Sequence, residues 1–336
     1  MEKMLIFGFS VTAEKDGYAP IAANIIEKSS KEISVDVKSI GGATFNLLPL
    51  IHNVLELKKY KYIILEISTC LRFNEDENYY HKILSDICLL FSRNGAKIGF
   101  LIFHRDNIDY KTDVMSKSII SFCQRNNFPV LDATPEVVAL REKGDEGQLL
   151  RDGTHTTPAG ANFYAEYAVR LARTLIDRPP AAVSENGMPA SGLMKIDTIK
   201  SLRKFENFEK GGISLPYLEL RQDRSIDLKF NRTIQFQGLM LVIGANSAWG
   251  KITIPDQNIE IERHIYDNRC YYYRYAYWFT KNIETDHLKI SALDKEPEVK
   301  LLKGDEWKGP RSLNIAGIFV RNYGDGQIKV KIPRKS

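Results

Sequence analysis

The residues of this chain best suited to chemistry are a serine near its start and an aspartate–histidine pair much further on. Ser10 follows a short apolar run, and Asp152 precedes His155 by three positions. A carboxylate at that spacing can orient the imidazole, which can then accept the proton of a serine hydroxyl. Gly42 lies between these motifs, and a glycine leaves its backbone N–H accessible, as an oxyanion hole requires. The pattern predicts a Ser10–His155–Asp152 triad.

Each motif also has a purely structural interpretation. Ser10 is placed to cap a following helix, as serine often does. Asp152 and the glycine after it are typical of a turn, with His155 on the surface. Gly42 fits a tight turn between a strand and a helix. Taken singly, these interpretations remain open, and the order of the motifs along the chain is what favours catalysis.

The elements that must position these residues alternate along the first half of the chain. Short, almost wholly apolar runs predict strands, and longer periodic segments between them predict helices. The expected strands are Met4–Gly8, Ile33–Val37, Tyr62–Ile67, Lys97–Phe103 and Pro129–Leu131; the expected helices are Tyr18–Lys28, Thr44–Leu57, Tyr79–Arg93, Lys111–Arg125 and Ala159–Ile176. This alternation predicts a parallel sheet covered by helices, with its active site at the carboxyl ends of the strands.

The pattern changes after a segment rich in Pro, Ala, Ser and Gly, which we expect to be a linker over residues 179–193. Short alternating segments then predict strands at Ser225–Phe230, Thr233–Phe236, Leu239–Ile243, Lys251–Ile254, Tyr271–Phe279, Leu288–Ala292, Ile315–Val320 and Gln327–Ile332. Many short strands with turn residues between them are typical of a β-sandwich or jelly roll. We therefore expect a catalytic domain over residues 1–178 and a β-rich accessory domain over residues 194–336.

The motifs of the first half resemble those of the SGNH or GDSL hydrolase family. The opening block GFSVTAEKDGYAP places Ser10 at the nucleophile position, and DGTHTTPAGANFYAEYAVRLA places Asp152 and His155 in the family's closing block. Gly42 matches the oxyanion glycine. The resemblance covers about residues 1–177 and implies a flavodoxin-like three-layer α/β fold. It also implies an acyl-serine mechanism, with the backbone N–H groups of Ser10 and Gly42 binding the oxyanion.

Two positions depart from the family pattern. Phe9 replaces the aspartate of Gly-Asp-Ser, and Cys70 stands where the family has an oxyanion-binding asparagine. A thiol is a weak donor, so a side chain from the same loop, Asn74 or Arg72, is expected to complete the oxyanion hole. Cys70 as an alternative nucleophile is disfavoured, because no second histidine has a recognisable place beside it.

Composition and charge bear on the class of partner, the cellular compartment and the cofactors of this protein. The net charge of +5 lies in the second half, since residues 1–178 hold 22 basic and 23 acidic residues and residues 179–336 hold 25 and 19. This bias is too mild to predict nucleic-acid binding. The apolar runs are too short for a membrane span, and the N-terminus is typical of a buried strand. Four cysteines without CxxC spacing fit a reducing compartment. We expect a cytoplasmic enzyme with no metal and no organic cofactor.

Tyrosines dominate one expected strand of the second half. At strand spacing Tyr273, Tyr275 and Tyr277 share a face, and tyrosine rings with their hydroxyls suit sugar binding. The alternative is an aromatic strand that packs in the domain core.

The leading function is an esterase that removes O-acetyl or other short O-acyl groups from a carbohydrate or glycoconjugate. An O-acyltransferase that passes the acyl group from the same serine to a polysaccharide is the alternative within enzymes. A non-catalytic binding protein on an SGNH scaffold is the alternative outside them, because Phe9 and Cys70 depart from the family pattern.

Overall fold

The chain folds into two units, seen here in a computed structural model. One unit comprises Met1–Pro189 with Gly211–Ile213, and the other comprises Ala190–Lys210 with Ser214–Ser336. Most of the predicted linker, residues 182–190, lies outside the described residues. The structure describes residues 1–72, 75–92, 95–144, 149–181, 191–199, 202, 204–304, 306–321 and 329–331. Across these ranges no helix has the length and apolar character that crossing a membrane requires.

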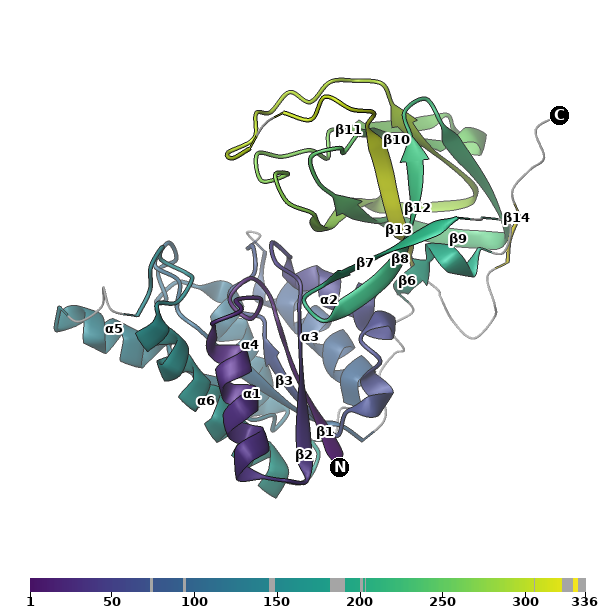
Figure 1. Ribbon diagram of the computed structural model, residues 1–336. Helices are drawn as coiled ribbons and strands as arrows, with labels where there is room; N and C mark the ends of the chain where they lie inside the picture. Colours follow the sequence, from purple (N-terminus) through teal and green to yellow (C-terminus); the bar gives the residue numbers. More distant parts are fainter. Residues whose placement is uncertain are drawn as a thin grey trace. The chain divides into compact units, whose positions relative to one another are not determined.

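A parallel sheet forms the centre of unit 1 (Figure 1). Its strand order is β2-β1-β3-β4-β5, the order of flavodoxin-like folds. The strands are β1 (Glu2–Gly8), β2 (Ile33–Ser39), β3 (Tyr62–Glu66), β4 (Lys97–Ile102) and β5 (Val130–Asp132). β3 is buried along its whole length, as expected for a strand covered on both faces. The predicted three-layer α/β fold is confirmed.

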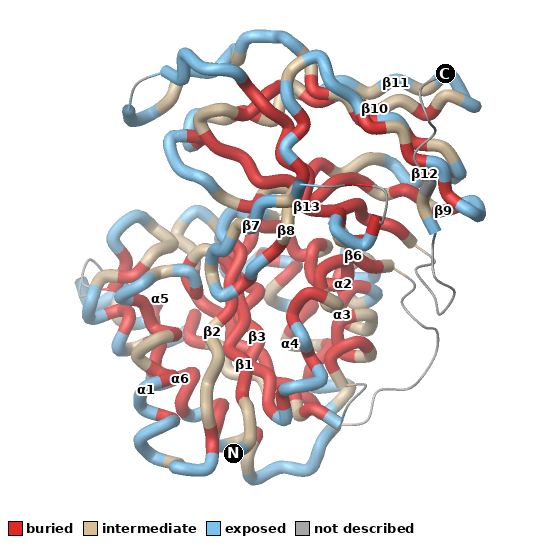
Figure 2. The backbone as a smooth tube through the Cα atoms, turned by 45° about the vertical axis from the view of Figure 1, so that its right-hand side comes forward, coloured by how far each residue is buried: buried red, intermediate tan, exposed pale blue. Residues whose placement is uncertain are grey.

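Helices cover both faces of this sheet, with α1 and α6 on one side and α3 and α4 on the other (Figure 2). Their apolar stripes pack on alternate residues of the strands, so that Met4 and Ile6 of β1 join the cluster under α1 and α6. The helices are α1 (Tyr18–Ser29), α2 (Leu48–Ile51), α3 (Glu77–Ser92), α4 (Val114–Arg125), α5 (Thr134–Glu142) and α6 (Pro158–Asp177).

The structure corrects two helix predictions in unit 1. The single helix expected over Thr44–Leu57 is a series of short turns, η1 (Phe45–Leu47), α2, η2 (His52–Val54) and η3 (Leu57–Lys59). Pro49 is compatible only with the first turn of a helix, and Glu56 adopts a left-handed φ of 56°. Helix α5 was not expected, although Pro135 in its first turn is a start signal.

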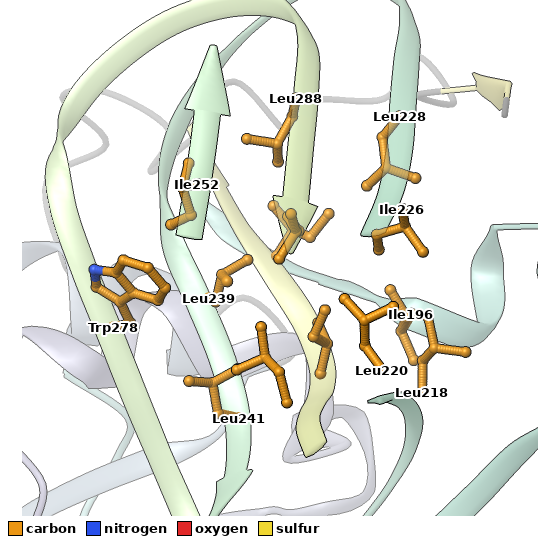
Figure 3. Packing of buried hydrophobic residues seen from close by; sticks show 14 of the residues in the cluster. Ile196, Leu218, Leu220, Ile226, Leu228, Leu239, Leu241, Ile252, Trp278 and Leu288 are labelled. Atoms are coloured by element: carbon orange, nitrogen blue, oxygen red, sulfur yellow. The ribbon is translucent and has the colours of Figure 1, made fainter. Parts of the chain in front are cut away.

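Unit 2 is an antiparallel β domain, as predicted. Within the residues that the structure describes, nine strands join one hydrogen-bonded sheet around an apolar core, in which Trp278, Leu239 and Ile252 lie together (Figure 3). The strands are β6 (Gly192–Lys195), β7 (Phe205–Lys210), β8 (Ile213–Arg221), β9 (Ser225–Ile243), β10 (Trp249–Ile254), β11 (Ile259–Arg263), β12 (Arg274–Leu293), β13 (Ser312–Arg321) and β14 (Val330–Lys331).

Strand boundaries in unit 2 differ from the prediction because some turn-like residues lie inside strands. The three strands expected between Ser225 and Ile243 form the single strand β9. Gly238, with a φ of 140°, sits where the pairing of β9 with β12 shifts register. Such a bulge bends a strand without ending it. Strands β6, β7, β8 and β11 were missed; Pro216 inside β8 weakened its signal. Part of the strand expected at Gln327–Ile332 lies outside the described residues.

Candidate active site

Ser10 lies just beyond the carboxyl end of β1, in a tight turn. The N–H of Ala13 donates to the carbonyl oxygens of Phe9 (3.0 Å) and Ser10 (3.2 Å). Gly8, which ends the strand, has no room for a side chain, because a Cβ would lie 1.9 Å from Thr12 Oγ1. Phe9, at the family's aspartate position, is 1% exposed and belongs to the core. The turn therefore leaves the half-buried Ser10 at the sheet edge expected for an active site.

Asp152 and His155 lie in the turn of a small hairpin. Leu150 and Thr156 form an antiparallel bridge, and the N–H of Arg151 donates to the His155 carbonyl oxygen at 2.9 Å. The hairpin leads into α6, whose N-cap Thr157 accepts a hydrogen bond from the Gly160 N–H. The bridge and the cap together hold the turn at a fixed place before the helix.

The Asp152 carboxylate binds both the backbone and the ring of His155. Oδ1 accepts from the His155 N–H at 2.8 Å, and Oδ2 lies 2.9 Å from Nδ1. A carboxylate only accepts, so Nδ1 donates and Nε2 is left as the proton acceptor. Partial burial raises the pKa of Asp152, but the hydrogen bonds from His155 outweigh it, and the pKa lies below its ordinary value. Half of the expected triad is thus formed; the bond from Ser10 to His155 stays a prediction.

A direct link joins the Ser10 loop to the hairpin. Glu14, four residues after Ser10, accepts hydrogen bonds from Thr156 Oγ1 (2.9 Å) and the Thr156 N–H (3.3 Å). The other carboxylate oxygen of Glu14 pairs with Arg151. Glu14 was part of the quoted opening motif but was not recognised as a site residue.

A second carboxylate, Glu66 at the end of β3, ties together three neighbouring loops. It is completely buried, and it accepts hydrogen bonds from Ser68 Oγ (2.9 Å), the Thr69 N–H (3.0 Å), Thr69 Oγ1 (2.8 Å) and Thr12 Oγ1 (3.4 Å). Ser68 in turn accepts from the Phe103 N–H beyond β4 at 2.8 Å. Burial raises the pKa of Glu66 despite these donors. A charged residue at the end of an apolar run was the sequence signal for this role.

Gly42 lies on the loop after β2, beside both neighbouring loops. Its φ of 70° favours glycine, although a Cβ there would meet no atom within 4 Å. Before it, the Ile40 N–H donates to the Gly8 carbonyl oxygen at 3.1 Å; after it, the Ala43 carbonyl accepts from the Leu71 N–H at 3.0 Å. The exposed Gly42 thus stands between the ends of β1 and β3, which suits the oxyanion role predicted for its N–H.

Arg72, one of the two side chains expected to complete the oxyanion hole, is hydrogen-bonded within and beyond the loop after β3. Its Nε and Nη2 bind the two oxygens of Asp113 at 3.2 and 2.8 Å, and Nη1 donates to the Ser68 and Cys70 carbonyl oxygens. Nη2 also reaches Ser116 Oγ at 3.5 Å. A guanidinium has five N–H groups, and all five have acceptors here. These bonds fix the loop to Asp113 and Ser116 and argue against the oxyanion role expected for Arg72, which stays a prediction. Asn74 lies outside the described residues.

Cys70 is a structural residue in this loop. It is 1% exposed, its thiol lies 3.7 Å from Met115 Sδ, and burial raises its pKa to about 12. A thiol so seldom ionised is a poor nucleophile. Its carbonyl oxygen also accepts from Arg105 Nη1 at 2.6 Å, a loop-to-loop contact that the sequence did not reveal.

Of the three tyrosines singled out in unit 2, only Tyr275 and Tyr277 lie at strand spacing, because β12 begins at Arg274. Tyr273 precedes the strand and is 42% exposed. Tyr275 is 3% exposed, and its hydroxyl donates to the Phe208 carbonyl oxygen at 2.6 Å, which leaves it no surface for a ligand. Tyr277 is partly buried. The alternative interpretation, core packing, holds for Tyr275.

The strand order of unit 1 defines a flavodoxin-like α/β fold, and the side chains described above gather at the carboxyl ends of its strands. No protein-family model and no curated protein matches the chain. Among solved structures, a two-domain esterase active on acetylated mannans, co-crystallised with mannopentaose, matches at 12% identity over 95% of this chain and 90% of that one, with a TM-score of 0.60.

Another crystal structure of a two-domain esterase active on acetylated mannans gives a TM-score of 0.59 at 12% identity, over 95% of this chain and 91% of that one. A member of the lipolytic protein G-D-S-L family from Veillonella parvula aligns with 51% of this chain and 98% of its own length, at 15% identity and a TM-score of 0.42. At 12% identity the likeness to the esterase is one of fold, and it extends through both units.

Proposed function

We propose that this chain is a serine-dependent acyl-ester hydrolase that removes O-acetyl or other short O-acyl groups from a carbohydrate or glycoconjugate. The observation that carries the proposal is the Asp152–His155 pair, with Nδ1 held by the carboxylate, in the unit that presents Ser10 at its sheet edge. The shared fold with an esterase supports an ester substrate, and that esterase's activity on acetylated mannans supports a carbohydrate.

In this mechanism Ser10 Oγ attacks the ester carbonyl carbon while its proton passes to His155 Nε2. The backbone N–H groups of Ser10 and Gly42 stabilise the negative oxygen that forms. The ester C–O bond then breaks, and the departing sugar oxygen takes the proton from Nε2. Water next gives a proton to Nε2 as it attacks the carbonyl carbon of the acyl-serine. The bond from that carbon to Ser10 Oγ then breaks, Oγ takes the proton from Nε2, and the carboxylic acid leaves. Asp152 stabilises the imidazolium in both halves.

Two backbone donors make a weaker oxyanion hole than three. Loss of one donor costs about 100- to 1000-fold in rate elsewhere, so we expect a slow enzyme unless the substrate or Asn74 supplies a further donor. Tyr273 and Tyr277 remain our candidates for sugar contacts in unit 2, because both keep some exposed surface.

The test is hydrolysis of p-nitrophenyl acetate, with and without sugar acceptors. We expect turnover that Ser10→Ala abolishes, and labelling of the wild type at Ser10 by a fluorophosphonate. Acceleration by a sugar, with acylated sugar as product, would identify the O-acyltransferase. Absence of both turnover and labelling would leave a binding protein on the same scaffold. Labelling that persists in Ser10→Ala, or that maps to Cys70, would refute the assigned nucleophile.

A further inference from the structure

Glu14 lies four residues after Ser10, and its carboxylate binds Arg151 and Thr156, the residues on either side of the Asp152–His155 turn. We propose that Glu14 is a positioning residue that sets the approach of His155 to Ser10. The inference rests on the proposed function, because it assumes that these two side chains exchange a proton. It adds a residue to which the opening motif, although it contains Glu14, gave no role.

On one side, Glu14 belongs to the same turn as Ser10. The N–H of Ala13 donates to the Ser10 carbonyl oxygen at 3.2 Å, and the N–H of Glu14 donates to Val11 at 3.4 Å. The Glu14 carbonyl oxygen accepts from the Gly17 N–H at 3.2 Å, just before α1 begins. Successive bonds of this kind make residues 10–17 one compact segment, so a displacement of Glu14 displaces Ser10.

On the other side, the carboxylate of Glu14 holds both strands of the hairpin that carries the acid–base pair. Thr156 directly follows His155, is 4% exposed, and donates to Glu14 through its hydroxyl and its N–H. Arg151 directly precedes Asp152 and forms an ion pair with the same carboxylate. The contacts therefore flank the catalytic turn on each side without touching its catalytic atoms.

The two contacts are of unequal strength. The Arg151 side chain is 57% exposed, and an ion pair so open to solvent contributes little. The Glu14 side chain is only 11% exposed, and the bonds from Thr156 are shielded and charge-assisted, the stronger kind. Thr156 is thus the main anchor. Displacement of a catalytic group by about 1 Å can cost about 100-fold in rate, so a shielded two-bond contact is enough to matter.

The matching experiment compares Glu14→Ala, Glu14→Gln and Thr156→Val in the full chain. We expect Glu14→Ala and Thr156→Val each to lower kcat for p-nitrophenyl acetate by about 10- to 100-fold, with little change in KM. The double variant should be no worse than Glu14→Ala, since Glu14→Ala already removes both bonds from Thr156. Glu14→Gln keeps an oxygen for Thr156 and should retain most of the activity.

Glu27→Ala is the matched control. Glu27 also accepts a hydrogen bond from a backbone N–H, that of Val35 at 2.8 Å, but this bond joins α1 to β2 away from the site. The kcat of Glu27→Ala should equal that of the wild type. Hydrogen exchange at the His155 and Thr156 amides gives a readout independent of activity. Exchange should be faster in Glu14→Ala than in the wild type, and it should be unchanged in Glu27→Ala.

Unchanged kcat and exchange in Glu14→Ala, beside an active wild type, would overturn the inference. Additive losses in the double variant would do so too, because they would assign Glu14 and Thr156 separate roles. A wild type without esterase activity would overturn the proposed function instead, and the exchange data would still show whether Glu14 holds the hairpin.

Discussion

Replacing the buried Glu66 is the sharpest test of how the site loops are held. Glutamine keeps the shape of the side chain but removes its charge, whereas leucine removes every acceptor. Neither variant substitutes Ser10, Asp152 or His155, so each one perturbs only the loops that Glu66 holds.

The magnitudes follow from the four donors that meet Glu66. In Glu66→Leu, Ser68 still has the Phe103 backbone as a partner, and Thr12 keeps its 2.9 Å bond to the Tyr18 hydroxyl. The N–H and hydroxyl of Thr69 lose their acceptor, at about 1–3 kcal/mol each, or about 2–6 kcal/mol in all. Glu66→Gln only exchanges hydrogen bonds, so we expect a change below about 1.5 kcal/mol near pH 5.

The dependence on pH distinguishes charge from shape. Burial raises the folded-state pKa of Glu66 above the ordinary 4.5. Between the unfolded and folded values the folded state binds more protons, so the wild type loses stability as pH rises through that window. Glutamine does not titrate. The stability of Glu66→Gln relative to the wild type should therefore increase as pH rises above the ordinary pKa of 4.5.

The two units can be followed separately during urea denaturation. All tryptophans (Trp249, Trp278 and Trp307) lie in unit 2, and within the described ranges every α-helix lies in unit 1. Circular dichroism at the helical minimum therefore reports the affected unit, and tryptophan fluorescence serves as an internal control. A stability of Glu66→Gln relative to the wild type that stays constant as pH rises, or that falls, would refute the account of a carboxyl whose pKa is raised by burial. An unaltered unit 1 transition in Glu66→Leu would refute its role as a support.

Three further substitutions test other parts of the structure. Asp152→Asn places an amide nitrogen opposite Nδ1 of the histidine and favours the wrong tautomer, so kcat should fall on the order of 100- to 10,000-fold; a loss below tenfold would contradict the triad. Arg72→Ala removes the ion-pair partner of Asp113 and should destabilise unit 1 by about 3 kcal/mol, measured by circular dichroism. The kcat of the folded variant should fall less than tenfold. A larger fall would support Arg72 as an oxyanion donor. Tyr275→Phe removes the donor to Phe208 and should destabilise unit 2 by about 1–2 kcal/mol, seen in tryptophan fluorescence, and no shift would show that solvent replaces that bond.

The first unit was predictable in outline because its signals are local. Strands buried on both faces are continuous apolar runs, and β1, β3 and β4 were recognised within two residues at each end. The helix predicted over Thr44–Leu57 was wrong because the many apolar residues of this segment favoured a helix, whereas Pro49 does not allow the backbone to continue one.

Long-range contacts account for what the sequence could not reveal. Spacing alone brought Asp152 and His155 together, since one turn contains both. The partners of Glu14 lie 137 and 142 positions away, and nothing in local pattern connects them. The bond from Arg72 to Asp113, which directly precedes α4, is likewise a contact between distant segments that the sequence did not reveal.

Because all four cysteines are buried, the rate at which each thiol is labelled reports how often its surroundings open. All four thiols are buried, with Cys70 in the loop beside the site, Cys88 and Cys123 on α3 and α4, and Cys270 in unit 2. A thiol in such a place reacts with a maleimide only while its surroundings are transiently open. If Cys70 is labelled faster than Cys88 and Cys123, its labelling rate measures local opening of the loop that contains it. This opening would be measured under conditions in which global unfolding is not detectable.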